Sequence, residues 1–300
     1  MPPKKNKKIK ENNISGLINQ ASLFFKQKKF SLPDLEAELL LSYILKKDRI
    51  FILAHPEYII DSKKIKEFYN LVKSRLAGWS SAVLLGNKEF YGLDFLVNKD
   101  VLVPRPETEL LVDIILEKVK INNKVTIIDI GTGSGAIICS LFNKLKADLA
   151  ISFYASDKSE KALSVARYNA NQYRASNGSM IKFFKGDLLK PYLQILKKLK
   201  PDNLIIAANL PYLTPEEIKE PSIKKEPKMA LLSGCDGLWH YKRLFSQLKL
   251  AKLYHVFLIC EINHHQALAI KKLAEASFPN SKTYFKNDYT RRIRFFILEF

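Results

Sequence analysis

The spacing of apolar residues divides the chain into a helical part and an α/β part. Over residues 14–76 apolar positions recur at three- and four-residue steps, as in EAELLLSYIL at residues 36–45, a spacing typical of amphipathic helices. Glycine occurs once in the first 77 residues, at Gly16, and strand-like alternation is absent there. We therefore predict a small all-helical domain over residues 13–80.

Beyond Lys124 short runs of Ile, Val, Leu and Phe alternate with amphipathic segments. This alternation predicts a parallel sheet covered by helices on both faces. The chain then ends in two runs, at residues 282–287 and 292–300, that only a short turn separates. We expect these two to pair antiparallel at one side of the sheet. The earlier strands are predicted as VTIIDI (125–130), ISFYAS (151–156), IKFF (181–184), NLIIAA (203–208) and HVFLIC (255–260).

A segment with two glycines separates the two parts. Residues 83–98, VLLGNKEFYGLDFLVN, alternate apolar and polar positions, which predicts a β-hairpin linker over residues 81–103. The sequence VPRPETELLVDIILEKV follows, and its Pro106 suits the first turn of a helix. The second domain is expected to cover residues 104–300.

The composition is that of a folded, basic protein. Hydrophobic residues make up 47% of the chain and charged residues 26%, which is enough for a sizeable core. The net charge is +19, and five lysines lie in the first ten residues, so we expect residues 1–12 to form a disordered basic tail. Only nine of the 49 basic residues are arginine, the residue best suited to bidentate recognition of phosphate. We expect the charge to steer encounters with anionic partners without defining the partner.

The chain lacks the signals of membrane, secreted and metal-binding proteins. No apolar run reaches the ~18 residues that a membrane span needs, and no apolar segment follows the charged N-terminus. The cysteines, at positions 139, 235 and 260, are too scattered for a disulfide framework or a thiolate metal site. His264 and His265 are adjacent, so their side chains point to different faces. We expect a cytoplasmic protein without a metal.

A glycine-rich turn follows the first predicted strand and opens a predicted helix. It reads Asp129-Ile130-Gly131-Thr132-Gly133-Ser134-Gly135. Glycines let the backbone approach a ligand closely, at the sheet edge where open α/β sheets bind ligands. Asp157 ends the next strand, 22 residues beyond Gly135, close to the ~20 expected of an acid that holds a ribose. The ligand is expected to be a nucleoside cofactor, either a dinucleotide or S-adenosylmethionine, and the Asp129 carboxylate favours the positively charged second.

The predicted strand NLIIAA ends in a polar and aromatic turn, Asn209-Leu210-Pro211-Tyr212. The Asn209 side-chain oxygen and the Leu210 carbonyl can each accept one N–H hydrogen of a planar amide or exocyclic amine. That would direct the nitrogen lone pair at a methyl donor. Tyr212 can stack on the planar group and face the developing positive charge. The turn therefore predicts methylation of a weakly nucleophilic nitrogen, mostly by positioning.

Several segments together resemble the peptide chain release factor glutamine methyltransferases, the PrmC/HemK family. EAELLLSYIL is similar to the family's N-terminal helical domain, and DIGTGSGAI is similar to its cofactor loop. EFYGLDFLVNKDVLVPRPETELLVD resembles its linker and first helix, and EPKMALLSGCDGL at residues 226–238 resembles a further family segment. The PRPETE run together with the helical domain is the specific part of the match, because glycine loops and Asn-Pro turns occur in many methyltransferases.

The resemblance implies a Rossmann-like α/β fold, a seven-stranded methyltransferase sheet joined by the hairpin to a helical domain that recognises the substrate. It implies transfer of a methyl group from S-adenosyl-L-methionine to the side-chain amide N5 of the glutamine in the Gly-Gly-Gln loop of release factors. With a protein substrate we expect no need for stable nucleic-acid binding, no membrane association and a monomer. The resemblance also places Arg105 and Glu107 in a loop beside the cofactor. By position it assigns the cofactor to Gly131, Thr132, Gly133, Ser134, Gly135, Asp157, Asp187, Leu188 and Asn209, and the substrate glutamine to Asn209, Leu210, Pro211 and Tyr212.

Two positions depart from the family pattern. Leu210 stands where the family has proline, which keeps the backbone carbonyl but gives a less rigid turn. The sequence EINHHQ replaces a glycine-bearing turn after Glu261, at a place that we expect to lie away from the chemistry. Asn-Leu-Pro-Tyr also resembles the turn of the ribosomal-RNA adenine dimethyltransferases. N6-methylation of adenine in RNA or DNA is therefore the alternative, and a ribosome-associated binding protein without catalysis is a third.

Overall fold

The computed structural model describes residues 12–119, 124–148, 150–199, 203–219 and 223–300. Chain contacts divide it into two compact units, Met1–Gly86 and Asn87–Phe300. All but the last residue of the predicted basic tail lies outside the described residues. None of the described helices is both long and apolar enough to cross a membrane.

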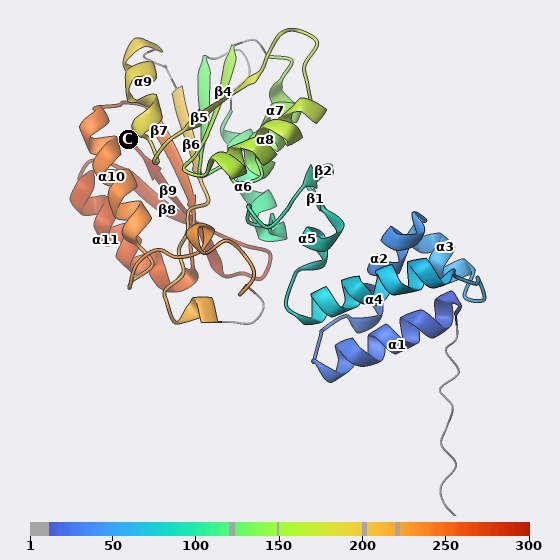
Figure 1. Cartoon of the computed structure of the whole chain (residues 1–300). Coiled ribbons are helices and arrows are strands. Elements are labelled where there is room, and N and C mark those ends of the chain that lie inside the picture. The colour runs from blue at the N-terminus through green and yellow to red at the C-terminus, as the bar shows by residue number, and fades with distance from the viewer. Residues whose placement is uncertain (1–11, 120–123, 149, 200–202, 220–222) are drawn as a thin grey trace, which may run out of the picture. The chain divides into compact units, whose positions relative to one another are not determined.

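The first unit is helical, as predicted (Figure 1). Its helices are α1 (Ile14–Gln27), α2 (Pro33–Leu45), α3 (Arg49–Ala54), α4 (Ser62–Leu76) and α5 (Ser81–Leu85). The side chains of Asn13, Asp48 and Asp61 accept a hydrogen bond from a backbone N–H in the first turn of α1, α3 and α4, and each such cap contributes about 1 kcal/mol. Phe25 and Phe68 are fully buried in the core between the helices.

Residues 81–85 form a helix, whereas the sequence predicted the start of the hairpin there. Ser80 caps α5 by accepting a hydrogen bond from the Val83 N–H, and Gly86 ends it at φ +74°. Ser81 Oγ also donates to the Glu36 carboxylate, which binds Arg75 through Nε at 2.9 Å and Nη2 at 2.6 Å. The local cap and these contacts with α2 and α4 therefore override the strand-like alternation of the sequence.

The second unit begins with the predicted hairpin, which is shorter than expected. Strands β1 (Asn87–Phe90) and β2 (Leu93–Leu96) pair antiparallel. The turn residues Tyr91 and Gly92 have φ of +55° and +72°, the positive pair that two-residue hairpin turns require. Phe90 and Phe95 are buried in the core beneath the large sheet, which anchors the hairpin to this unit.

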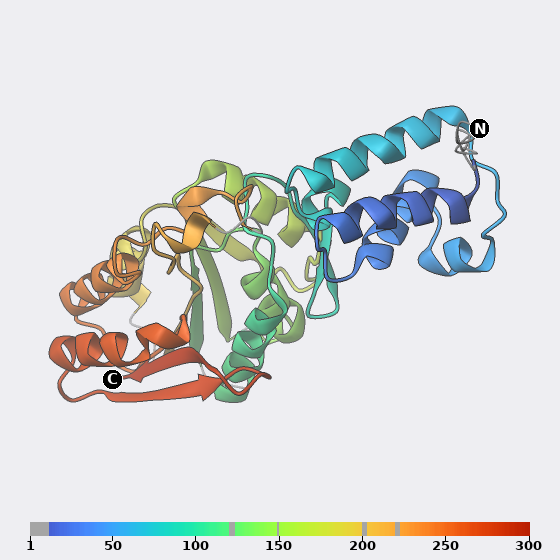
Figure 2. The same ribbon diagram turned by 90° about the horizontal axis from the view of Figure 1, so that it is seen from below.

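The large sheet has seven strands among the described residues, in the order β5-β4-β3-β6-β7-β9-β8. They are β3 (Val125–Ile130), β4 (Ile151–Asp157), β5 (Ile181–Lys185), β6 (Asn203–Ala208), β7 (Val256–Glu261), β8 (Lys282–Asn287) and β9 (Ile293–Glu299). The first five are mutually parallel, and β9 runs antiparallel to both of its neighbours. The β8–β9 pair forms one edge of the sheet (Figure 2). Both the seven-stranded α/β fold and the terminal antiparallel pair are confirmed.

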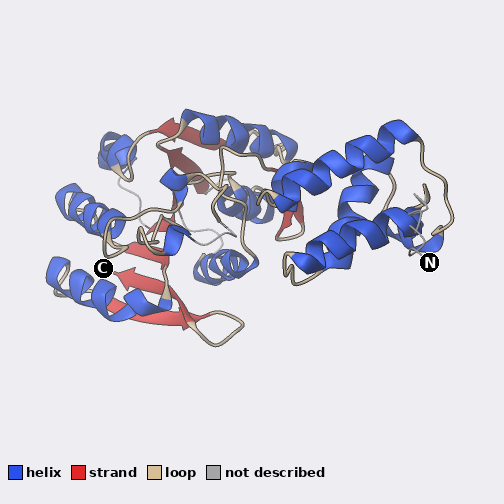
Figure 3. Cartoon of the chain, turned by 60° about the horizontal axis from the view of Figure 1, so that its bottom comes forward, coloured by secondary structure: helices blue, strands red, loops and turns tan. Residues whose placement is uncertain are grey.

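Helices cover both faces of the sheet (Figure 3). Alternate residues of each central strand belong to different cores: in β6, Leu204, Ile206 and Ala208 face one core, and Ile205 and Ala207 face the other. The first core is closed by α9 (Leu193–Leu199), α10 (Trp239–Ala251) and α11 (Ala267–Ser277), and the second by α6 (Glu109–Lys118) and α7 (Ala136–Leu145), with α8 (Glu160–Gln172) beside α7. Five 3₁₀ turns are also described: η1 (Pro106–Thr108), η2 (Lys190–Tyr192), η3 (Glu217–Lys219), η4 (Lys228–Ala230) and η5 (His264–Gln266).

The strand order places a ligand site at one point of the sheet. The chain runs outward from β3 through β4 to β5, and then returns to form β6 on the other side of β3. At such a reversal the loops leave the carboxyl ends of neighbouring strands in opposite directions and open a crevice. The glycine-rich turn follows β3 and the Asn209 turn follows β6, so both predicted motifs flank this crevice.

Candidate active site

The glycine-rich turn requires its glycines for two different reasons. Gly131, Gly133 and Gly135 have φ of +72°, +56° and +82°, values that L side chains rarely adopt. A Cβ on Gly131 would lie 3.1 Å from Leu210 Cδ2, and one on Gly135 would lie 3.2 Å from Ala166 Cβ. A Cβ on Gly133 would meet nothing within 4 Å. Gly133 therefore borders open space, whereas Gly135 lets α7 and α8 approach each other.

We expect Gly135→Ala to lower the free energy of unfolding by about 1–3 kcal/mol, because the alanine would be strained at positive φ and crowded by Ala166. The matched control is Gly178→Ala, at φ +83° with nothing within 4 Å of its Cβ. Urea unfolding of both variants separates the two causes. Equal losses would show that the packing against Ala166 contributes nothing.

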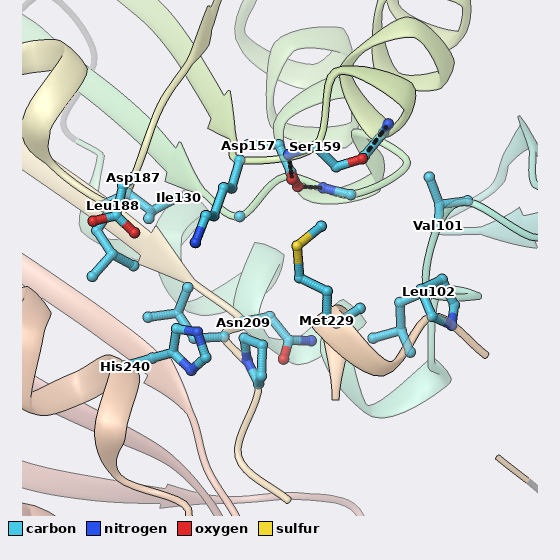
Figure 4. Close-up of a pocket in the computed structure, with 18 of the residues that line it drawn as sticks. Val101, Leu102, Ile130, Asp157, Ser159, Asp187, Leu188, Asn209, Met229 and His240 are labelled. Carbon is cyan, nitrogen blue, oxygen red and sulfur yellow. Dashed lines mark hydrogen bonds between the residues drawn. The ribbon is translucent and has the colours of Figure 1, made fainter. Parts of the chain in front are cut away.

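The Asp157 carboxylate is oriented by backbone N–H groups. Gly133 N donates to Oδ2 at 3.0 Å and Ser159 N donates to Oδ1 at 2.8 Å (Figure 4). Burial raises the pKa of Asp157, and these backbone hydrogen bonds oppose the shift. Each carboxylate oxygen can accept a further hydrogen bond. The group is thus held in place to accept two neighbouring hydroxyls from a ligand.

Asp129, at the end of β3, is a buried acid with an unsatisfied oxygen. Thr132 Oγ1 donates to Oδ2 at 2.6 Å, while Oδ1 has no hydrogen-bond partner among the described residues. Burial raises the pKa of Asp129 to about 7, with the charge of Asp157 adding to the shift and the Thr132 hydrogen bond opposing it. The hydrogen bond from Thr132 thus ties the end of β3 to the glycine-rich turn.

We expect Asp129 to make the ligand-free protein less stable as the pH rises from about 4 to about 7. Its pKa is about 7 in the folded protein and about 3.9 in an unfolded chain. In this range the folded protein binds more protons than the unfolded chain, so the free energy of unfolding falls with rising pH, by up to about 4 kcal/mol. Asp129→Asn should remove this part of the slope in urea unfolding at pH 4.5 and 7.5. An equal slope in both proteins would contradict the assignment.

A pocket opens between the glycine turn and the Asn209 turn. It holds about 770 Å³ of empty space, open solvent at its mouth included. The predicted residues that line it are Gly131, Gly133, Asp157, Asp187, Leu188, Asn209, Leu210 and Pro211. Thr132, Ser134 and Gly135 do not line it. They support the turn: Thr132 binds Asp129, and the Ser134 carbonyl accepts from Asn169 Nδ2 at 2.8 Å.

At one end of the pocket Asp187 pairs with Arg243 of α10. The Arg243 guanidinium also lies over the Trp239 ring, 4.3 Å from its centroid. His240 lines the pocket (Figure 4), and its Nδ1 lies 3.0 Å from Ser233 Oγ. Burial, helped by the charge of Arg243, lowers the pKa of His240 to about 4, so its ring is neutral at pH 7. Sequence reasoning missed Arg243 and His240, because no motif links α10 to β5.

A second pocket, with about 660 Å³ of empty space including open solvent, meets the first at the Asn209 turn. Leu102, Asn209, Leu210, Pro211 and Ala230 line both pockets. Tyr212 lines the second pocket, with apolar side chains around it. Burial raises the pKa of Tyr212, so its phenol stays neutral and presents a ring rather than a base. The turn thus stands between the first pocket and a second, mostly apolar one.

The Asn209 side chain is held by two residues that the sequence analysis did not assign to the site. Its Nδ2 donates to Glu261 Oε2 at 2.9 Å and to Thr108 Oγ1 at 3.2 Å. Thr108 Oγ1 itself donates to Glu261 Oε2 at 2.6 Å. Ala208 and Cys260 are register partners in the parallel β6–β7 pair, so the next residues, Asn209 and Glu261, come side by side. The sequence would have predicted this contact only with the knowledge that β6 and β7 are neighbours in the sheet.

The segment after Glu261 contacts the turn, so the expectation that it lies away from the chemistry was wrong. Gln266 Nε2 donates to the Tyr212 carbonyl at 2.9 Å, and Gln266 Oε1 accepts from Asn263 N at 3.1 Å. Asn263 and Gln266 form a capping box that opens η5 ahead of α11. The capped 3₁₀ turn η5 therefore stands in place of a glycine-bearing turn, and its Gln266 contacts the Tyr212 backbone.

Two further loops contribute lining residues to the pockets. Arg105 Nη2, from the PRPETE run, donates to Glu226 Oε1 at 2.5 Å. Arg105 lines the second pocket and Leu102 lines both, so this loop borders each of them. Met229, three residues after Glu226, projects into the first pocket between Asp157 and Asn209 (Figure 4). The Arg105–Glu226 ion pair thus links the loop that carries Met229 to the PRPETE run.

Comparison with known proteins places these features in a family. The PrmC N-terminal domain family matches residues 16–86. The chain is 36% identical over 265 residues to the release factor glutamine methyltransferase of Bacillus subtilis (strain 168), covering 86% of this chain and 88% of that protein. It is 36% identical over 244 residues to the enzyme of the same name from Coxiella burnetii (strain RSA 493 / Nine Mile phase I), covering 81% and 84%.

A solved structure supports the fold. The hMettl16 catalytic domain in complex with MAT2A 3′UTR hairpin 1 is 15% identical to this chain, with a TM-score of 0.51 over 86% of this chain and 90% of that one. At this identity the likeness concerns the fold alone. The two relatives, in contrast, match along more than four fifths of their own length. The chain therefore belongs to the release factor glutamine methyltransferase family.

Proposed function

We propose that this protein transfers a methyl group from S-adenosylmethionine to the side-chain amide nitrogen of the glutamine in the Gly-Gly-Gln loop of peptide chain release factors. The observation that carries the proposal is the meeting of two pockets at Asn209, Leu210 and Pro211. One pocket suits a nucleoside cofactor and the other a flat side chain. Family membership then points to glutamine, rather than adenine, as the group that enters the second pocket.

The residues of the first pocket fit S-adenosylmethionine. The open space at Gly133 and the positive φ of the turn leave room for close approach of the ligand. Asp157, which lines the pocket, would accept the ribose hydroxyls. Asp187 and Leu188 would bound the adenine. When bound, the cofactor supplies an electrophilic methyl group.

The Asn209 turn would hold the glutamine side chain. Because Nδ2 of Asn209 is engaged by Glu261 and Thr108, its Oδ1 is left to accept an N–H of the substrate amide. The Leu210 carbonyl would accept the other N–H, so that the nitrogen lone pair faces the cofactor. Such alignment can supply a large part of the rate enhancement.

No strong base is needed at the turn. An amide nitrogen becomes acidic once it is alkylated, so its proton can pass to water. Tyr212 stays a neutral phenol because burial raises its pKa, and its ring can face the positive charge that develops on the nitrogen. The site would therefore act by orientation.

The test is to incubate the protein with S-adenosylmethionine and a purified release factor, and to map the product by tandem mass spectrometry. We expect one added methyl group, on the side chain of the glutamine in the Gly-Gly-Gln loop. Methylation at other residues alone would contradict the proposal.

We further propose that the helical unit contacts the release factor, so deleting residues 1–86 should raise KM for the protein substrate more than it weakens cofactor binding.

A further inference from the structure

A buried hydrogen-bonded group lies behind the Asn209 turn. Glu261 and Thr108 have relative exposures of 2% and 4%. Both contact Asn209 through Nδ2, which donates toward Glu261 Oε2 and Thr108 Oγ1, two oxygens that lie 2.6 Å apart on the same side of the amide nitrogen. The three residues come from different elements, namely the loop after β6, the end of β7 and the 3₁₀ turn η1.

These contacts determine the orientation of the Asn209 side-chain amide, that is, which side carries its oxygen and which its nitrogen. An amide can rotate by half a turn and exchange its oxygen with its NH₂ group, at little steric cost. In the rotated form the Asn209 oxygen would oppose the Glu261 carboxylate oxygen, two acceptors without a hydrogen between them. Two buried acceptors left facing each other without a hydrogen bond are costly. The observed orientation is therefore strongly preferred.

We propose that Glu261 and Thr108 are positioning residues that keep the Asn209 oxygen directed at the substrate. The inference rests on the proposed function and deepens it. With Nδ2 directed at Glu261 and Thr108, the Asn209 oxygen faces the other way and can accept a hydrogen bond from the substrate. The site then favours a group that carries N–H hydrogens, such as a carboxamide, over a carboxylate, which would place oxygen against oxygen.

The test is a set of single substitutions. Glu261→Gln replaces one carboxyl oxygen with an NH₂ group, which can donate a hydrogen bond, so the Asn209 amide can also adopt its rotated orientation. We expect kcat to fall about 10- to 100-fold. Thr108→Val should lower kcat about tenfold, and Thr108→Ser should restore it. KM for the release factor and the Kd of S-adenosylmethionine should stay within about threefold. Thr126→Val, which removes a buried hydroxyl from β3, is the matched control with unchanged kcat.

A second readout does not depend on the substrate. In protein labelled with ¹⁵N-asparagine, the Asn209 side-chain NH₂ signal, identified by its absence in Asn209→Ala, should exchange slowly with water and become fast in Glu261→Gln. Slow exchange that Glu261→Gln abolishes, in a protein that does not methylate release factor, would refute the proposed function and leave the positioning role standing. Unchanged kcat in folded Glu261→Gln, or unchanged exchange, would overturn the positioning role.

Discussion

Asn209→Ala is expected to lower the turnover number of methyl transfer by about 100-fold or more. The substitution removes the acceptor that would align the substrate amide and empties the junction of the two pockets. The glycine turn and Asp157 remain in place, so the Kd of S-adenosylmethionine should change by less than about threefold. Steady-state kinetics with a release factor measure the first quantity, and calorimetry measures the second.

The control for this variant is Asn177→Ala. Asn177 is an exposed asparagine that donates to the Lys146 carbonyl, away from both pockets, so the control should retain full turnover. Unimpaired turnover in folded Asn209→Ala would remove Asn209 from the mechanism. A proportional loss of cofactor affinity would instead make it a cofactor-binding residue alone.

Asp157→Ala is expected to raise the Kd of S-adenosylmethionine about 100-fold. The change removes the carboxylate that would accept the ribose hydroxyls, and hydrogen bonds to a charged group contribute ~1.5–3 kcal/mol each. It also frees the Gly133 N–H that Asp157 holds at 3.0 Å. Isothermal titration calorimetry gives the affinity directly.

Glu160→Ala is the matched control, because it removes a nearby negative charge that pairs with Arg167 on the surface and does not line the pocket. Its Kd should stay within about twofold of the wild type. If Asp157→Ala folds and binds the cofactor as tightly as Glu160→Ala does, the ribose is held elsewhere.

Local patterns were sufficient for the strands and for both turns. VTIIDI and NLIIAA form β3 and β6 with the bounds that were expected, because short, buried, β-branched runs next to glycine or proline leave few alternatives. The glycine turn and Asp157 meet because parallel neighbouring strands end at the same edge. Five residues at the start of the hairpin were misjudged, since Ser80 and Gly86 stabilise a short helix there.

The partners of the site residues come from distant parts of the chain. Thr108 and Asn209 are 101 positions apart, and Thr108 and Glu261 are 153 apart. Their contact depends on β7 lying beside β6 and on η1 lying at the carboxyl ends of these two strands, which apolar spacing does not reveal. The pairing of Asp187 with Arg243 has the same origin. The sequence thus predicted the residues expected to contact the ligands better than the residues that orient them.

The most direct test of the proposed function is methyl transfer from labelled S-adenosylmethionine to three substrates in parallel. These are a release factor, the same factor with the glutamine of its Gly-Gly-Gln loop replaced by alanine, and ribosomal RNA. We predict label in the first substrate and none in the other two. Label in the RNA alone would show that the Asn209 turn receives adenine, and it would contradict glutamine methylation by this protein.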